Sequence, residues 1–110
     1  MYIGEASKLT GLSVKAIRLY EEKGLIRVPA RSGRYRIYSK ADIEILNLIA
    51  ESKRLGVTLA SLKNVIVYNE NGVDWHRIKL FLQEVKTKLI AERKLIDERI
   101  LLVESCISEI

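Results

Sequence analysis

The fold of this 110-residue chain is decided by residues 13–24, SVKAIRLYEEKG. Ser13 is a good helix N-cap, and Gly24 is the residue type that most often follows a helix C-terminus. Between them, apolar residues lie on one face at helical spacing and charged residues lie on the other. A shorter helical run lies between Gly4 and Gly11, just upstream. We therefore predict two short helices joined by a tight turn, which is the helix-turn-helix pattern.

The segment that follows predicts a small β-hairpin. Residues 25–28 form an apolar run, residues 29–33 contain the only proline and a glycine, and residues 34–38 alternate in character. We expect strands at 25–28 and 34–38 with a turn between them, an addition called a wing when it follows a helix-turn-helix. The predicted outward positions are Arg34 and Arg36, with Tyr35 at the edge.

Three further helices are expected. Ser39 caps one that ends near Gly56, and Thr58 caps a shorter one that carries apolar residues up to position 66. After a polar break at residues 68–72, no glycine or proline interrupts residues 73–110. Apolar side chains recur there with a helical period, at positions 78, 82, 85, 89, 96, 100, 103, 107 and 110.

The last helix is too long for the small domain before it. At about 1.5 Å per residue it would extend about 57 Å. One core of this size cannot cover so long an apolar stripe, which favours dimerisation through a coiled coil. We therefore predict a mainly α fold with two parts: a winged helix-turn-helix domain with a supporting helix pair, residues 1–72, and a dimerisation helix, residues 73–110.

The positive charge is concentrated at one end of the chain. The net charge is +5, and residues 1–40 hold nine Lys and Arg against three Glu. Residues 41–72 hold three basic and four acidic side chains, and residues 73–110 hold seven of each. An excess confined to the first third indicates a polyanionic partner for that part.

Several classes of function are disfavoured. Cys106 is the only cysteine, which excludes an intrachain disulfide and a multi-cysteine metal cage within one chain. His76 and Cys106 are too far apart on one helix to form a nucleophile and base pair, and no glycine spacing fits a phosphate loop. No signal segment or membrane-length apolar run is present, so we expect a cytoplasmic protein without membrane association that is not an enzyme.

The chain resembles a known family. The resemblance lies in residues 3–13, IGEASKLTGLS, in residues 15–18, KAIR, in residues 20–26, YEEKGLI, and then in Tyr35-Arg36 and Tyr38. These motifs are similar to those of the MerR family of bacterial transcriptional regulators, and the likeness extends over essentially the whole chain.

The resemblance implies a homodimer with an antiparallel coiled coil. Such a dimer binds a pseudo-palindromic promoter element in double-stranded DNA whose spacer, between the hexamers that RNA polymerase recognises, is overlong. Members of the family bend and untwist that DNA when an effector binds, so part of their specificity depends on DNA deformation.

The candidate DNA-binding residues fall into three groups. Lys15 and Arg18, on the exposed face of the second helix, are placed to enter a major groove, where an arginine pairs with guanine in bidentate fashion. By resemblance, Tyr20 contacts the DNA backbone, and the wing residues hold phosphates without specifying sequence. The remaining matched positions contact the backbone in relatives. The full set is Lys15, Arg18, Tyr20, Arg34, Tyr35, Arg36, Arg54 and Lys63.

The effector and any cofactor are not identified by the sequence, and none is required for the fold. If two long helices pair antiparallel about residue 91 or 92, Cys106 of one chain faces about residues 76–78 of the other. Cys106 and His76 from opposite chains, with Asp74 near, are then a candidate site for a thiophilic metal or for redox sensing. The alternative is that both are structural residues.

Two other functions are open. An architectural, excisionase-like DNA-bending protein would share the winged helix but would lack the long helix and the effector. A coiled-coil scaffold would leave the basic first third unexplained.

Overall fold

The computed structural model describes residues 1–70 and 72–110. The chain divides into two compact units, Met1–Ile78 and Lys79–Ile110. The first unit contains all the described strands and the start of the last helix, and the second unit is the rest of that helix. The predicted boundary between residues 72 and 73 falls within the last strand of the first unit. The first unit itself continues through Ile78.

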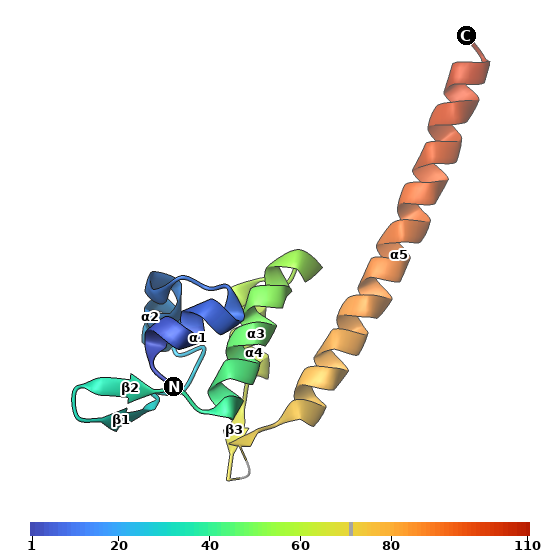
Figure 1. Cartoon of the computed structure of the whole chain (residues 1–110). Helices are drawn as coiled ribbons and strands as arrows, with labels where there is room; N and C mark the ends of the chain where they lie inside the picture. Colours follow the sequence, from blue (N-terminus) through green and yellow to red (C-terminus); the bar gives the residue numbers. More distant parts are fainter. Residues whose placement is uncertain (71) are drawn as a thin grey trace. The chain divides into compact units, whose positions relative to one another are not determined.

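The described elements follow the predicted order with one addition (Figure 1). They are α1 (Ile3–Thr10), α2 (Val14–Glu22), β1 (Ala30–Ser32), β2 (Tyr35–Ile37), α3 (Lys40–Leu55), α4 (Leu59–Val65), β3 (Tyr68–Asn69), β4 (Gly72–Val73) and α5 (Trp75–Ser108).

Side-chain caps begin three of these helices at the predicted residues. The Ser13 hydroxyl accepts a hydrogen bond from the amide of Ala16, and Thr58 accepts one from Ser61. Ser39 and Asp42 form a reciprocal capping box at the start of α3. These bonds satisfy amides that a helix leaves free at its first turn, which is why the predicted starts of α2, α3 and α4 are confirmed.

The wing is shifted from its predicted position. The first strand is β1, Ala30–Ser32, so the strand expected at residues 25–28 is wrong. The apolar side chains of Leu25 and Ile26 are instead buried in the core. The amide of Leu25 donates a hydrogen bond to the carbonyl of Tyr20 in the turn that ends α2. The hairpin pairs Ala30 with Ile37 and Ser32 with Tyr35, leaving a two-residue turn.

The polar break predicted at residues 68–72 contains a second small hairpin. Strands β3 and β4 pair antiparallel, with Tyr68 opposite Val73 and Asn69 opposite Gly72. Residue 71 of that segment lies outside the described residues. Strands of two residues are too short to show the alternation by which a sequence signals a strand, so the pattern could not predict them.

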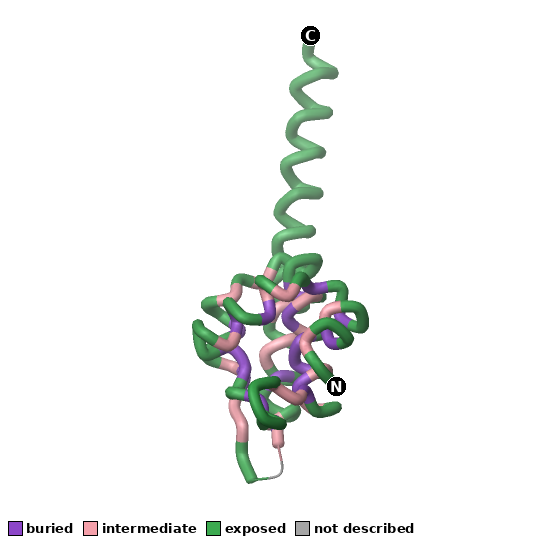
Figure 2. Tube along the Cα trace, turned by 60° about the vertical axis from the view of Figure 1, so that its left-hand side comes forward, coloured by how far each residue is buried: buried purple, intermediate pink, exposed green. Residues whose placement is uncertain are grey.

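The core of the first unit is built by α1, α2, α3 and α4. Figure 2 shows where the buried residues lie along the chain. The apolar side chains of the core are contributed by these helices, by the residues that flank the wing and by the first turn of α5. The fully or almost fully buried members are Ala6, Ile17, Tyr20, Leu25, Ile26, Tyr38, Ile45, Leu46, Ile49, Leu62 and Ile78.

The second unit presents its apolar side chains to solvent. Leu89, Ile96, Ile100 and Ile107 of α5 are 48–65% exposed. The helical segment from residue 79 to residue 108 is about 45 Å long at 1.5 Å per residue. Apolar side chains repeated over that length are a surface that single soluble domains rarely leave uncovered. No helix of the described residues is long and apolar enough to span a membrane.

Candidate nucleic-acid interface

Helix α2 presents two cations to solvent because its apolar face is buried. Ile17 and Tyr20 lie in the core, whereas Lys15 and Arg18 lie on the opposite, exposed face. The turn before the helix is closed by Gly11, whose φ of 74° is the left-handed conformation that glycine adopts most readily. The side chains of Lys15 and Arg18 form no hydrogen bond or ion pair within residues 1–70 and 72–110. Both are free to meet a ligand.

Tyr20 belongs to the core. It is only 2% exposed, so its ring stabilises the packing of α2, and little of the side chain is left to meet a ligand. That Tyr20 contacts the DNA backbone stays a prediction.

The wing exposes two of its three predicted residues. Arg34 lies in the turn of the hairpin, and Tyr35, at the start of β2, is 66% exposed. Arg36 differs from the expectation that it points outward beside Arg34. Its Nε donates to Oε1 of Glu21 at 2.6 Å, and its Nη2 donates to Oε2 at 2.8 Å. This hydrogen-bonded pair raises the pKa of the Arg36 guanidinium.

The first two residues of the chain brace the wing, a feature that the sequence did not indicate. The amide of Tyr38 donates to the carbonyl of Met1 at 2.7 Å, and the amino group of Met1 donates to the carbonyl of Tyr38 at 3.1 Å. The rings of Tyr2 and Tyr35 meet edge to face, with centroids 5.7 Å apart. The N-terminal segment is therefore attached both to the base of the wing and to β2.

A hollow of about 100 Å³ lies where these elements meet. Its lining comes from the start of α1, from α2 and from the wing, and it brings together three guanidinium groups and two aromatic rings. The lining residues are Tyr2, Ile3, Arg18, Arg34, Tyr35 and Arg36. Guanidinium groups gathered beside aromatic rings suit the binding of phosphate groups, to which arginine donates two hydrogen bonds at once.

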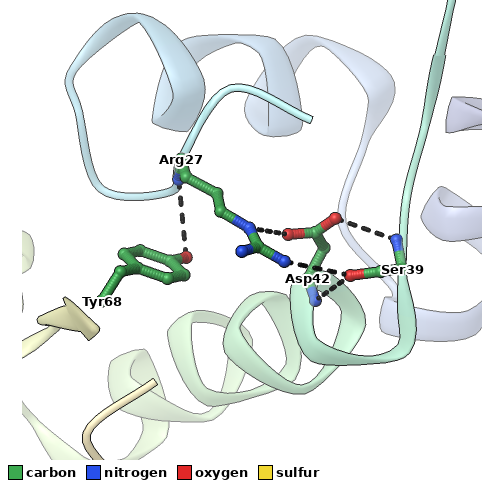
Figure 3. A network of polar contacts seen from close by, with 4 residues as sticks. All are labelled: Arg27, Ser39, Asp42 and Tyr68. Atoms are coloured by element: carbon green, nitrogen blue, oxygen red, sulfur yellow. Dashed lines mark hydrogen bonds and ion pairs between the residues drawn. The ribbon is translucent and has the colours of Figure 1, made fainter. Parts of the chain in front are cut away.

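A polar network holds the base of the wing (Figure 3). Arg27 precedes β1, and its Nε donates to Oδ1 of Asp42 at 3.2 Å. The other carboxylate oxygen of Asp42 accepts the amide of Ser39 at 2.9 Å. Arg27 also lies over the ring of Tyr68, 5.3 Å from its centroid, in a cation–π contact. The chain entering the wing, the chain leaving it and β3 are thus joined through one guanidinium.

The two remaining candidates for backbone contact lie outside this cluster. Arg54, near the end of α3, is strongly exposed and pairs with Glu51 of the same helix at 3.4 Å. Lys63, on α4, is exposed, and its side chain passes near Gly24, which follows α2. Neither joins the hollow, and their assignment to DNA stays a prediction.

The effector candidates are not brought together within one chain. His76, in the first turn of α5, and Cys106, in its last turn, are both exposed. Asp74 caps the same helix, because its Oδ1 accepts the amide of Arg77 at 3.2 Å. In the described part of the chain, no three His, Cys, Asp or Glu side chains are grouped as a metal site would need. The composite site between two chains stays a prediction.

Comparison with known proteins agrees with this architecture. The model of the MerR HTH family of regulatory proteins matches residues 1–68. The HTH-type transcriptional regulator CueR of Vibrio cholerae is 46% identical over 67 residues, which is 60% of this chain. The match spans only 48% of that relative, so about half of its length has no counterpart in the match.

Two solved structures share the fold. The N-terminal part of MtaN, the multidrug transporter activator of Bacillus subtilis, has a TM-score of 0.69 and 25% identity, and the match covers 97% of each chain. The transcription regulator PbrR691 of Ralstonia metallidurans CH34, solved in complex with lead(II), has a TM-score of 0.54 and 26% identity. That match covers 89% of this chain and 81% of the other. The fold class predicted from the sequence is confirmed, and this chain belongs to the MerR HTH family of regulatory proteins.

Proposed function

We propose that this protein is a transcriptional regulator that binds double-stranded promoter DNA as a homodimer. The observation that carries the proposal is the set of exposed cations on the winged helix-turn-helix: Lys15 and Arg18 on α2 and Arg34 in the wing turn. Membership of a family of regulatory proteins supports it. The role is binding and positioning, and catalysis plays no part in it.

The two surfaces have different tasks on DNA. Helix α2 enters the major groove, where Arg18 donates to the O6 and N7 atoms of a guanine and Lys15 lies beside it. The wing follows the backbone, with Arg34 and Tyr35 at phosphates. Tyr20, Arg36, Arg54 and Lys63 complete the candidate set, with Arg54 and Lys63 at more distant phosphates.

Dimerisation through α5 gives the DNA site its symmetry. Two long helices in antiparallel register would cover each other's exposed apolar side chains, which suits a coiled coil. A two-fold dimer then binds two half-sites of a pseudo-palindrome at a fixed spacing. Bending and untwisting the DNA between them would change how RNA polymerase meets the promoter. An architectural DNA-bending protein without an effector has no need of such a helix.

We also propose that binding of an effector controls how the protein distorts the DNA. The solved relative in complex with lead(II) makes a thiophilic metal a reasonable first ligand to test. Cys106 of one chain and His76 of the other are the candidate ligands, because thiolate and imidazole suit such metals.

Two arginine variants test the DNA-binding proposal. The protein first selects its preferred duplex from a random pool, and fluorescence anisotropy then measures its affinity over a range of salt concentrations. Arg18→Ala should lose about 1–3 kcal/mol on the selected duplex and much of its sequence preference. Arg34→Ala should lose affinity for every duplex and lower the salt dependence by about one counterion. Equal losses for Arg18→Ala on selected and random DNA would overturn the base-reading role of that residue.

A further inference from the structure

The ion pair between Glu21 and Arg36 is the tightest in the described residues. Both carboxylate oxygens are used, at 2.6 and 2.8 Å, in the fork geometry that makes arginine–carboxylate pairs strong and directional. The Glu21 side chain is 14% exposed and that of Arg36 is 33% exposed. Two donors of Arg36 are therefore already used by Glu21 of α2.

A carboxylate beside this hollow should weaken the binding of a polyanion. Glu21 bonds an arginine that lines the same hollow as Arg18 and Arg34. If DNA phosphates approach there, a carboxylate repels them, and removing it should by electrostatics alone strengthen binding. A carboxylate at this position is explained if its hydrogen bonds with Arg36 fix the positions of the neighbouring cations.

The wing needs such an organiser. It is a hairpin of two three-residue strands, and an isolated two-stranded hairpin is marginally stable at best. Its register also places Arg31 directly opposite Arg36, a like-charge pair that disfavours the hairpin. The Glu21 carboxylate offsets one of these two charges and attaches β2 to α2. The contacts of Met1 and Tyr2 hold other points of the same hairpin.

We propose that Arg36 is a positioning residue held by Glu21, which sets the wing against α2 so that Arg18 and Arg34 reach DNA in a fixed relation. This inference rests on the proposed function and replaces the expectation that Arg36 binds a phosphate directly. The two roles predict opposite signs for the loss of Glu21. A direct phosphate ligand would be freed and would bind DNA more tightly, whereas an unsupported wing would bind more weakly.

The experiment compares Glu21→Ala with Glu22→Ala as a matched control. Both substitutions remove one negative charge from the end of α2, but the exposed Glu22 side chain makes no ion pair in the described residues. The probe is the duplex that the wild-type protein selects from a random pool. Glu22→Ala should bind at least as well as wild type. Glu21→Ala should bind about tenfold more weakly, despite its more positive charge.

Two further measurements separate positioning from a general loss of structure. In the Glu21→Ala background, adding Arg34→Ala should cost much less affinity than it does in wild type, because the wing no longer places Arg34 at the DNA. Arg36→Lys, which keeps the charge but loses the fork, should lose nearly as much affinity as Arg36→Ala. Far-ultraviolet circular dichroism checks that each variant is folded, and Glu21→Gln, which keeps the shape, replaces Glu21→Ala if that variant unfolds.

The outcomes are distinct. Tighter binding by Glu21→Ala, or a full Arg34→Ala loss in its background, would overturn the positioning role and restore Arg36 as a phosphate ligand. Failure of the wild-type protein to bind any selected duplex would instead overturn the proposed function on which this inference rests.

Discussion

Replacing Arg27 with alanine should destabilise the folded state by leaving the buried Asp42 without its cation. The side chain of Asp42 is only 4% exposed, and Arg27 is its one ion-pair partner in the described residues. Removing one partner of a fully buried pair typically costs about 3–5 kcal/mol, because a buried charge is left uncompensated.

Two features reduce that figure here. Arg27 is itself 45% exposed, so water already screens part of the pair. Asp42 also keeps the hydrogen bond from the amide of Ser39 at 2.9 Å. We therefore expect Arg27→Ala to lower the free energy of unfolding by about 2 kcal/mol. The loss of the contact with Tyr68 adds to this and is included in the value.

Urea denaturation followed by circular dichroism measures the effect, at one protein concentration because the proposed dimerisation would make the apparent stability depend on concentration. Arg54→Ala is the control: its pair with Glu51 is exposed on both sides, so it should cost less than about 0.5 kcal/mol. Asp42→Asn in the Arg27→Ala background should recover part of the loss, because no buried charge remains. A change below about 0.5 kcal/mol for Arg27→Ala would refute the assignment of this network as the support of the wing.

Four further predictions concern buried tyrosines and α5. Tyr38→Phe should leave the free energy of unfolding unchanged or slightly higher, since the buried Tyr38 hydroxyl has no hydrogen-bond partner in the described residues. Burial raises the pKa of Tyr38 and of Tyr68, so the unfolded chain releases these protons at a lower pH than the folded chain does. The free energy of unfolding should therefore fall as the pH rises above about 10. The fall should be shallower in Tyr38→Phe. If urea titrations at alkaline pH gave the same dependence of stability on pH for this variant and for wild type, burial of Tyr38 would not be a cause of the fall. Replacing Leu89 and Ile96 with Asp should abolish the dimer in sedimentation experiments, because the substitutions place charge in the proposed seam; a wild-type chain that is monomeric at micromolar concentration yet binds its DNA tightly would overturn that seam. Cys106→Ser and His76→Ala should each weaken a metal- or oxidant-dependent change in transcription, and wild-type responses from both would exclude the composite site.

Local signals in the sequence were sufficient to predict most of the fold. Ser13, Ser39 and Thr58 cap helices because their hydroxyls reach an amide three residues ahead, a relation contained within a few positions. Gly24 and Gly56 end helices with positive φ, which is again a local property. The exposed cations of α2 followed from helical periodicity alone.

The features that the sequence could not predict depend on distant partners. Residues 25 and 26 have a strand-like pattern, but tertiary packing buries them beside α2, and the strand begins later. The carboxylate of Glu21 and the guanidinium of Arg36 are 15 positions apart, so no local rule pairs them. Met1 and Tyr38 are 37 positions apart, and their pairing exists only because the fold returns the wing to the chain's start.

Sequence-specific DNA binding is tested most directly by comparing the affinities of the wild-type protein for its selected duplex and for a random duplex of equal length at physiological salt. We predict a ratio of at least about 10³, which is typical of sequence-specific DNA-binding proteins, and a clear fall of that ratio in Arg18→Ala. Equal affinity of the wild-type protein for the two duplexes would exclude sequence-specific binding, because phosphate contacts alone would then explain all binding.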